Sequence, residues 1–240
     1  LFGSLIMLPI CLQTLMGYTA FLAGWVLGPG GVMAMISMPI AGRLITRVNP
    51  KAVLFVGAMI TAWSVLMMSW FNLSTDFYTV AWPRVIMGFG MGLLFVPLTT
   101  LTMSWIRNEE MGNASSVFNL LRMLGGSFGV AFASTLVSRR AQFHQARLSE
   151  GMSVLDRNFQ EAVPLVSNIL KGQGFAPSQL DGGTLGLLYK KLVTEATMMA
   201  FNDTFFVLAV LMAISGMLVL FMKRSHETAG SGRAQPAAAE

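Results

Sequence analysis

The sequence predicts an all-α membrane protein in which six transmembrane helices form one bundle. Only 11% of the 240 residues are charged, which is less than half of the roughly 25% usual in soluble domains. The mean hydropathy is +0.63, and no Asp, Glu, Lys or Arg occurs from Leu1 to Gly42. These three observations exclude a soluble enzyme domain and a disordered interaction protein.

The first two predicted helices share the charge-free run, with a break at residues 17–19. This run lacks the basic start of a signal peptide. The first residue, Leu1, lies inside an apolar stretch and is not Met. We therefore expect the chain to be a piece of a longer protein. The other four predicted helices follow apolar segments of about 20 residues or more, which is enough to cross a bilayer: Ala52 to Phe71, Phe77 to Ile106, Met111 to Val137 and Ala196 to Met222.

These segments divide the chain into four parts. Residues 1–137 hold five transmembrane helices, 138–195 form an extracytoplasmic and partly helical loop, 196–222 form the sixth helix, and 223–240 form a disordered cytoplasmic tail. Apolar residues in the outer loop recur at loose helical spacing, with breaks expected at Gly151 and Pro164. This loop either caps the outer mouth of the bundle or docks a periplasmic partner.

The positive charges of the short loops lie on one side of the predicted membrane. That side carries Arg43, Arg47, Lys51 and Arg107, and the tail on the same side begins with Lys223-Arg224. The positive-inside rule therefore places the C-terminus in the cytoplasm. The net charge of +5 is an orientation signal, and we expect no nucleic-acid partner.

Small residues spaced four apart predict close contacts between helices. They form three pairs in the second, fourth and fifth predicted helices: Gly24 and Gly28, Gly88 and Gly92, and Gly125 and Gly129. The segment Gly28-Pro29-Gly30-Gly31 predicts either a hinge in the transport pathway or a static kink, and Pro97 is expected to break the fourth helix.

Two arginines lie inside predicted helices, where a charge at the bilayer centre costs at least ~2.5–3.5 kcal/mol. Arg122 lies near the midplane, which predicts a buried role in coupling or gating; the alternative is capping of carbonyls at a helix break near Asn119. Arg84 lies nearer the outer end of its helix. There it either has a role in transport or extends its side chain outwards to the membrane surface. Asp203 is the only acid inside a predicted helix and a weak candidate for carrying protons, so the main carriers are expected outside this chain.

These residues bear on three candidate functions. An exporter of hydrophobic compounds fits the kinked helices, the deep Arg122 and the many Met and Phe residues. A carrier for a polar metabolite needs more polar side chains in the spans than Gln13, Asn119, Arg84 and Arg122 provide. An intramembrane enzyme needs a nucleophile with a base, or metal ligands, and the spans hold neither. We expect no cofactor and no metal site.

Several stretches of the sequence are similar to one family of transporters. They are Gly17–Ala20, Gly28–Gly31, Met38–Leu44, Arg47–Pro50, Gly88–Leu98, Asn119–Gly129, Arg139–His144 and Ala200–Phe205. Together they resemble the C-terminal half of EmrB/QacA-type drug:proton antiporters, the fourteen-span multidrug exporters of the major facilitator superfamily. The resemblance covers nearly all of the chain except its tail.

The resemblance implies a proton-coupled efflux of hydrophobic compounds by alternating access, in a bacterial inner membrane. Arg84 corresponds to the arginine of the superfamily's Arg-x-x-Gln-Gly motif, although Met87 replaces the glutamine. Gly42, Arg43 and Arg47 fall in the cytoplasmic loop motif that latches conformational states, with Thr46 in place of its usual aspartate. The implied partners are the lipid bilayer, the missing N-terminal bundle, hydrophobic substrates, protons, and the family's periplasmic adaptor and outer-membrane channel.

Overall fold

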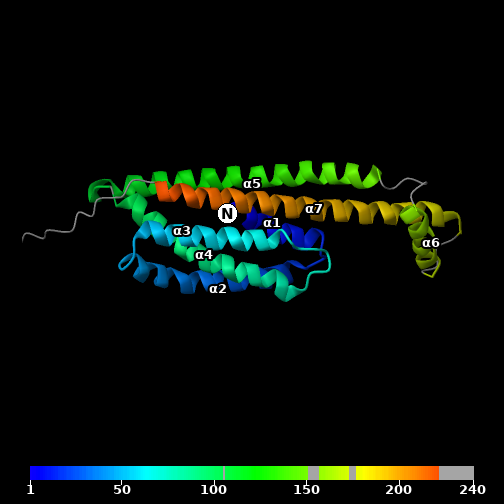
Figure 1. The fold of residues 1–240 in the computed structure, drawn as a ribbon, viewed down its shortest axis with the longest axis horizontal. Coiled ribbons are helices and arrows are strands. Elements are labelled where there is room, and N and C mark those ends of the chain that lie inside the picture. Colours follow the sequence, from blue (N-terminus) through cyan, green and yellow to red (C-terminus); the bar gives the residue numbers. More distant parts are fainter. Residues whose placement is uncertain (105, 151–156, 173–176, 222–240) are drawn as a thin grey trace, which may run out of the picture.

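In the computed structural model most helices of the chain run along one long axis, and α6 lies across it at one end (Figure 1). The structure describes residues 1–104, 106–150, 157–172 and 177–221, so the predicted break at Gly151 and the predicted tail lie outside the described residues. The elements in chain order are α1 (Phe2–Thr14), α2 (Ala20–Ile45), α3 (Pro50–Met68), α4 (Phe77–Met103), the short 3-10 helix η1 (Asn108–Glu110), α5 (Met111–Glu150), α6 (Arg157–Gly172) and α7 (Pro177–Phe221).

The all-α membrane class is confirmed by these elements. Five of the described helices, α2, α3, α4, α5 and α7, are long and apolar enough to cross a membrane. The first predicted transmembrane helix is α1, which is apolar but has only 13 residues. That length is short of the roughly 20 residues that a full crossing needs.

The turns between the first three helices follow from local sequence. Gly17 has a positive φ of 69°, a conformation that glycine adopts without a steric penalty. Thr19 then caps α2 by accepting a hydrogen bond from the backbone N–H of Leu22 at 3.3 Å. Asn49 caps α3 in the same way, and Pro50 occupies the first helical position, where its missing N–H costs no hydrogen bond.

The prolines do not end the helices, so the predicted breaks at Pro97 and Pro164 are wrong. α4 continues through Pro83 and Pro97, α6 continues through Pro164, and α2 continues through Pro29 and Pro39. Proline has a helical φ and removes a single backbone donor. Packing and side-chain hydrogen bonds from neighbouring helices can offset that loss inside a membrane protein.

The five long apolar helices and α1 form a ring of packed neighbours. α4 packs between α2 and α3, α7 packs between α3 and α5, and α1 packs against α5, α2 and α7, which closes the ring. The main apolar core therefore lies around α1, where fully buried Leu8, Cys11 and Leu12 meet Val26 of α2 and Phe205 of α7. A smaller core joins α2, α3 and α4 near their other end.

Glycines allow α4 to approach its neighbours closely. A Cβ at Gly88 would collide with the carbonyl oxygen of Gly30, and one at Gly92 would collide with the Ser37 hydroxyl, both on α2. A Cβ at Gly57 of α3 would lie 2.8 Å from the backbone carbonyl carbon of Leu93. The predicted contacts of Gly88 and Gly92 are therefore present.

The other predicted glycine contacts need correction. A Cβ at Gly24, Gly28, Gly125 or Gly129 would meet nothing within 4 Å among the described residues. The glycines that pack lie one or two positions away, on another face of the same helix: Gly30 on α2, and Gly126, which lies against Phe2, on α5. Gly129 contributes only its carbonyl oxygen, which faces Gly3 of α1.

α5 and α7 are longer than the membrane requires, and they run side by side beyond the rest of the bundle (Figure 1). Asn202 of α7 donates a hydrogen bond to the carbonyl oxygen of Phe71, in the α3–α4 loop, at 2.8 Å. Residue 202 therefore lies at the level where α3 ends and α4 begins. The part of α7 before Asn202, the last turns of α5 and the whole of α6 form a helical projection outside the predicted membrane.

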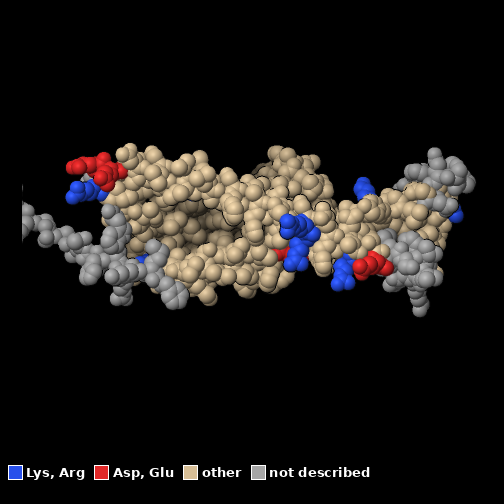
Figure 2. Space-filling view, turned by 90° about the horizontal axis from the view of Figure 1, so that it is seen from above, with Lys and Arg blue, Asp and Glu red and all other residues tan. Residues whose placement is uncertain are grey.

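Charged side chains are sparse along the middle of the molecule. In Figure 2 they gather at one end and on the half that includes the projection, and a long stretch without charge separates the two groups. Along α5, the distance from Met111 to Arg139 is about 42 Å at the helical rise. This matches the roughly 40–45 Å of a bilayer with its headgroups.

Candidate functional site

Arg84 of α4 is a buried charge with one weak partner. The residue is 6% exposed, which excludes the alternative that its side chain snorkels outwards. Its Nη1 donates to the thioether sulfur of Met87 at 3.1 Å, and its buried Nε has no hydrogen-bond partner. Met87 therefore gives this guanidinium only a weak acceptor.

The backbone around Arg84 is held by close helix packing. A Cβ at Gly30 of α2 would lie 2.7 Å from the carbonyl oxygen of Arg84. On the other side, the hydroxyl of Ser64 in α3 donates to the carbonyl oxygen of Pro83 at 2.5 Å. These contacts fix the start of the Arg84 side chain against two neighbouring helices.

Arg122 and Asn119 lie on a face of α5 that the described residues leave uncovered. Both side chains are exposed, as is Phe128, at 76%, farther along the helix. We predicted that Arg122 is buried, but the described residues of this chain do not bury it. The alternative role, capping carbonyls at a break near Asn119, is wrong because α5 is continuous from Met111 to Glu150.

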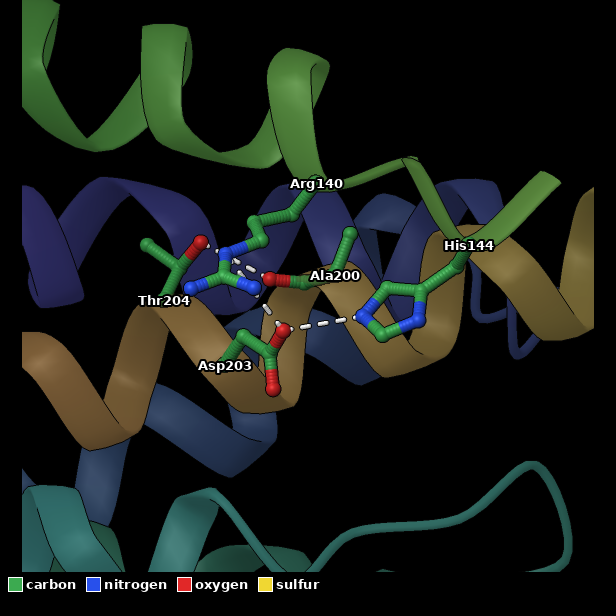
Figure 3. Close-up of polar contacts among 5 residues, drawn as sticks. All are labelled: Arg140, His144, Ala200, Asp203 and Thr204. Carbon is green, nitrogen blue, oxygen red and sulfur yellow. Dashed lines mark hydrogen bonds and ion pairs between the residues drawn. The ribbon is translucent and has the colours of Figure 1, made fainter. Parts of the chain in front are cut away.

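Asp203 of α7 contacts two residues of α5 (Figure 3). One carboxylate oxygen, Oδ2, lies 2.8 Å from His144 Nε2 and 3.6 Å from Arg140 Nε. Arg140 and Arg147 both lie over the ring of Phe143, at 5.9 and 5.8 Å from its centroid. The His144 side chain is the most enclosed member of the ion-paired group, at 17% exposure against 37% for Asp203.

Sequence reasoning missed the partners of Asp203, although two signals were available. An acid inside an apolar helix requires a partner, and both Arg140 and His144 belong to a stretch that carries the family resemblance. The two stretches are 59 positions apart, so local spacing does not connect them. Among the described residues, Arg84, Arg122 and Asp203 are not joined to one another by a hydrogen bond or an ion pair.

The remaining predicted site residues lie in separate places. Gln13 is exposed near the end of α1, and Pro29 lines an apolar hollow of about 560 Å³ with Tyr78 and Trp82. Arg43 and Arg47 are exposed at the end of α2, and Gly42 is half-buried beside them. Arg47 also lines a polar cavity of about 510 Å³ that includes Lys51 and Ser104, from α3 and the end of α4.

Comparison with known proteins gives one family. The model of the Major Facilitator Superfamily matches residues 1–130. The chain is 28% identical to the fatty acid resistance protein FarB of Neisseria gonorrhoeae over 96% of its length. It is 29% identical to the multidrug export protein EmrB of Escherichia coli over 96% of its length, and 23% identical to the colistin resistance protein EmrB of Acinetobacter baumannii over 95%. The chain spans 44% of the length of each of these relatives.

Proposed function

The chain belongs to the major facilitator superfamily of transporters, and on this premise we propose that it is the C-terminal half of a proton-coupled exporter of hydrophobic compounds. It would work by alternating access, in which two bundles rock around a site near the midplane of the membrane. The other bundle would come from the part of the relatives' length that this chain does not span.

The observation that carries this proposal is the uncovered face of α5. Arg122 lies 11 residues into the helix, about 17 Å from its cytoplasmic end at the helical rise, which is close to the midplane. A charge at this depth is costly against lipid. The face that holds Arg122 and Asn119 is therefore better matched by water or by a second bundle, as expected for a transport pathway.

The substrate class follows from the apolar side chains around this part of α5. Leu121, Met123, Leu124 and Phe128 are exposed on the neighbouring and opposite sides of the same turns of α5, and flexible apolar side chains suit varied hydrophobic ligands. The names of the relatives agree with this class, since they refer to multidrug export, fatty acid resistance and colistin resistance. The two polar side chains, Asn119 and Arg122, give less support to a carrier for a polar metabolite.

Proton coupling would depend on residues outside this chain. Among the described residues of the predicted apolar segments, Asp203 is the only acid, and His144 and Arg140 already hold it. The cytoplasmic residues Gly42, Arg43 and Arg47 would serve as the conformational loop. We place no catalytic residue in the chain, which would act as a transporter and not as an enzyme.

The proposed location is the bacterial inner membrane, with the C-terminus in the cytoplasm, because the basic loop residues follow the positive-inside rule. The projection of α5, α6 and α7 would then lie in the periplasm. It has the position in which a periplasmic adaptor, and through it an outer-membrane channel, would meet the transporter.

Efflux from cells that express the full-length protein tests this function. We expect lower accumulation of tetraphenylphosphonium and of a lipophilic uncoupler while the proton gradient is intact. A strain that carries a non-inserting version is the control. Unchanged accumulation of both compounds would count against the proposal, and a substrate-induced thermal shift with a sugar instead of a dye would favour the metabolite carrier.

A further inference from the structure

The guanidinium of Arg84 has no anion to balance it within the described bundle. The sequences of α1, α2, α3 and α4 contain no Asp or Glu. The nearest acid along the helix is Asp76, the exposed residue that precedes α4, and it is about 12 Å away at the helical rise. Asp203 lies on another helix, α7, and is paired with His144 and Arg140.

Burial of an unpaired charge is strongly unfavourable, because an isolated ion loses its hydration and gains nothing in return. A thioether sulfur is a weak acceptor, so the contact between Nη1 and Met87 does not replace a carboxylate. The Nε atom, which is buried and without a partner, is one of the donors that a carboxylate engages in a bidentate pair. The Arg84 guanidinium therefore lacks the carboxylate partner that its free donors would suit.

Close packing fixes the backbone turn of α4 that carries Arg84. The contacts of its carbonyl oxygen with Gly30 and of the preceding carbonyl with Ser64 hold this turn of α4 against α2 and α3. The side chain is thus presented from a rigid turn, which reduces the conformational entropy lost when an anion binds.

We propose that Arg84 binds a carboxylate that does not belong to these helices. This inference rests on the proposed transport function and specifies the chemistry of one of its sites. A carboxylate reaches the guanidinium from one of two sources, the head group of an amphipathic transported compound or a side chain of the other bundle. In both cases it pairs with Nε and a terminal nitrogen of Arg84.

The test uses purified full-length protein in detergent, with decanoate as the charged probe and decanol as the uncharged probe of equal chain length. Binding is measured by calorimetry for the natural protein and for Arg84→Met, Arg84→Lys and the control Arg107→Met, which removes an exposed charge outside the helices. We expect decanoate to bind at least tenfold more weakly to Arg84→Met. Decanol binding and the Arg107→Met variant should be unchanged, and Arg84→Lys should bind with intermediate strength.

The second source predicts another pattern. Decanoate then binds the natural and Arg84→Met proteins equally, Arg84→Met loses efflux, and neutralising one Asp or Glu of the other bundle restores it. Equal binding of decanoate with unimpaired efflux in Arg84→Met overturns the proposal, as does an equal loss of decanoate and decanol binding. Because binding is measured without transport, a protein that binds decanoate through Arg84 but exports nothing would contradict the proposed function alone.

Discussion

The imidazole of His144 lies 2.8 Å from a carboxylate oxygen of Asp203, and this contact joins α5 to α7 where both helices leave the bundle (Figure 3). Arg140, one turn before His144, adds an ion pair to the same oxygen at 3.6 Å. The three residues hold together the base of the projection.

We expect His144→Ala to destabilise the protein by about 1 kcal/mol. A hydrogen bond to a charged group contributes roughly 1.5–3 kcal/mol, and solvent reduces this value because Asp203 is 37% exposed. Thermal unfolding in detergent measures the effect. In a double-mutant cycle with Asp203→Asn, the two changes should not be additive; strict additivity would show that the pair is not coupled.

Two glycines of α2 provide a matched pair of substitutions. A Cβ at Gly30 would lie 2.7 Å from the Arg84 carbonyl oxygen, whereas one at Gly24 would meet nothing within 4 Å. Both changes to alanine gain similar helix propensity, so their difference isolates the steric clash. We expect Gly30→Ala to unfold at lower temperature, with a penalty of about 1–3 kcal/mol relative to Gly24→Ala. Equal melting temperatures would contradict the close contact of α2 with α4.

Removal of the Arg122 charge tests the pathway on α5. We expect Arg122→Ala in the full-length protein to reduce efflux while membrane insertion is preserved, because the residue lies on an exposed face and packs little within this bundle. Leu121→Ala, which truncates an exposed neighbour, should have a smaller effect. Normal efflux by a correctly inserted Arg122→Ala protein would exclude this residue from the mechanism.

Asn202 attaches α7 to the α3–α4 loop through its hydrogen bond to Phe71. Its replacement by alanine should cost about 1 kcal/mol of stability, the usual net value of one such bond. Ser215→Ala is the control, because that hydroxyl bonds only within its own helix. Differential scanning calorimetry of both variants would reveal the difference, and equal stability would mean that the loop contact contributes nothing.

Features set by neighbouring residues could be predicted from the sequence. The turn at Gly17 and Thr19 depends on local backbone chemistry, and the apolar helices follow from hydropathy, although α3 begins at Pro50 and not at the predicted Ala52. The face that each helix presents could not be predicted, because it depends on the partner. Gly28 and Gly30 are two residues apart, which is a rotation of about 200° around the helix, so the spacing of small residues selected the wrong face of α2.

The site shows the same division between local and tertiary information. The depth of Arg84 and Arg122 follows from their positions along apolar helices. The burial of Arg84 and the exposure of Arg122 follow from which helices meet, and the pairing of Asp203 with His144 joins segments 59 positions apart. The loop of residues 138–195 was predicted to be partly helical, but its continuity with α5 and α7 was not predicted, because hydropathy marks where the membrane ends and not where the helix ends.

Transport by purified full-length protein in liposomes tests the central claim, export driven by protons. With an acidic lumen and a neutral exterior, we expect a hydrophobic dye to accumulate in the liposomes while protons leave them. Collapse of the gradient with nigericin should abolish the accumulation. Dye movement of the same rate and extent with and without the gradient would contradict the account.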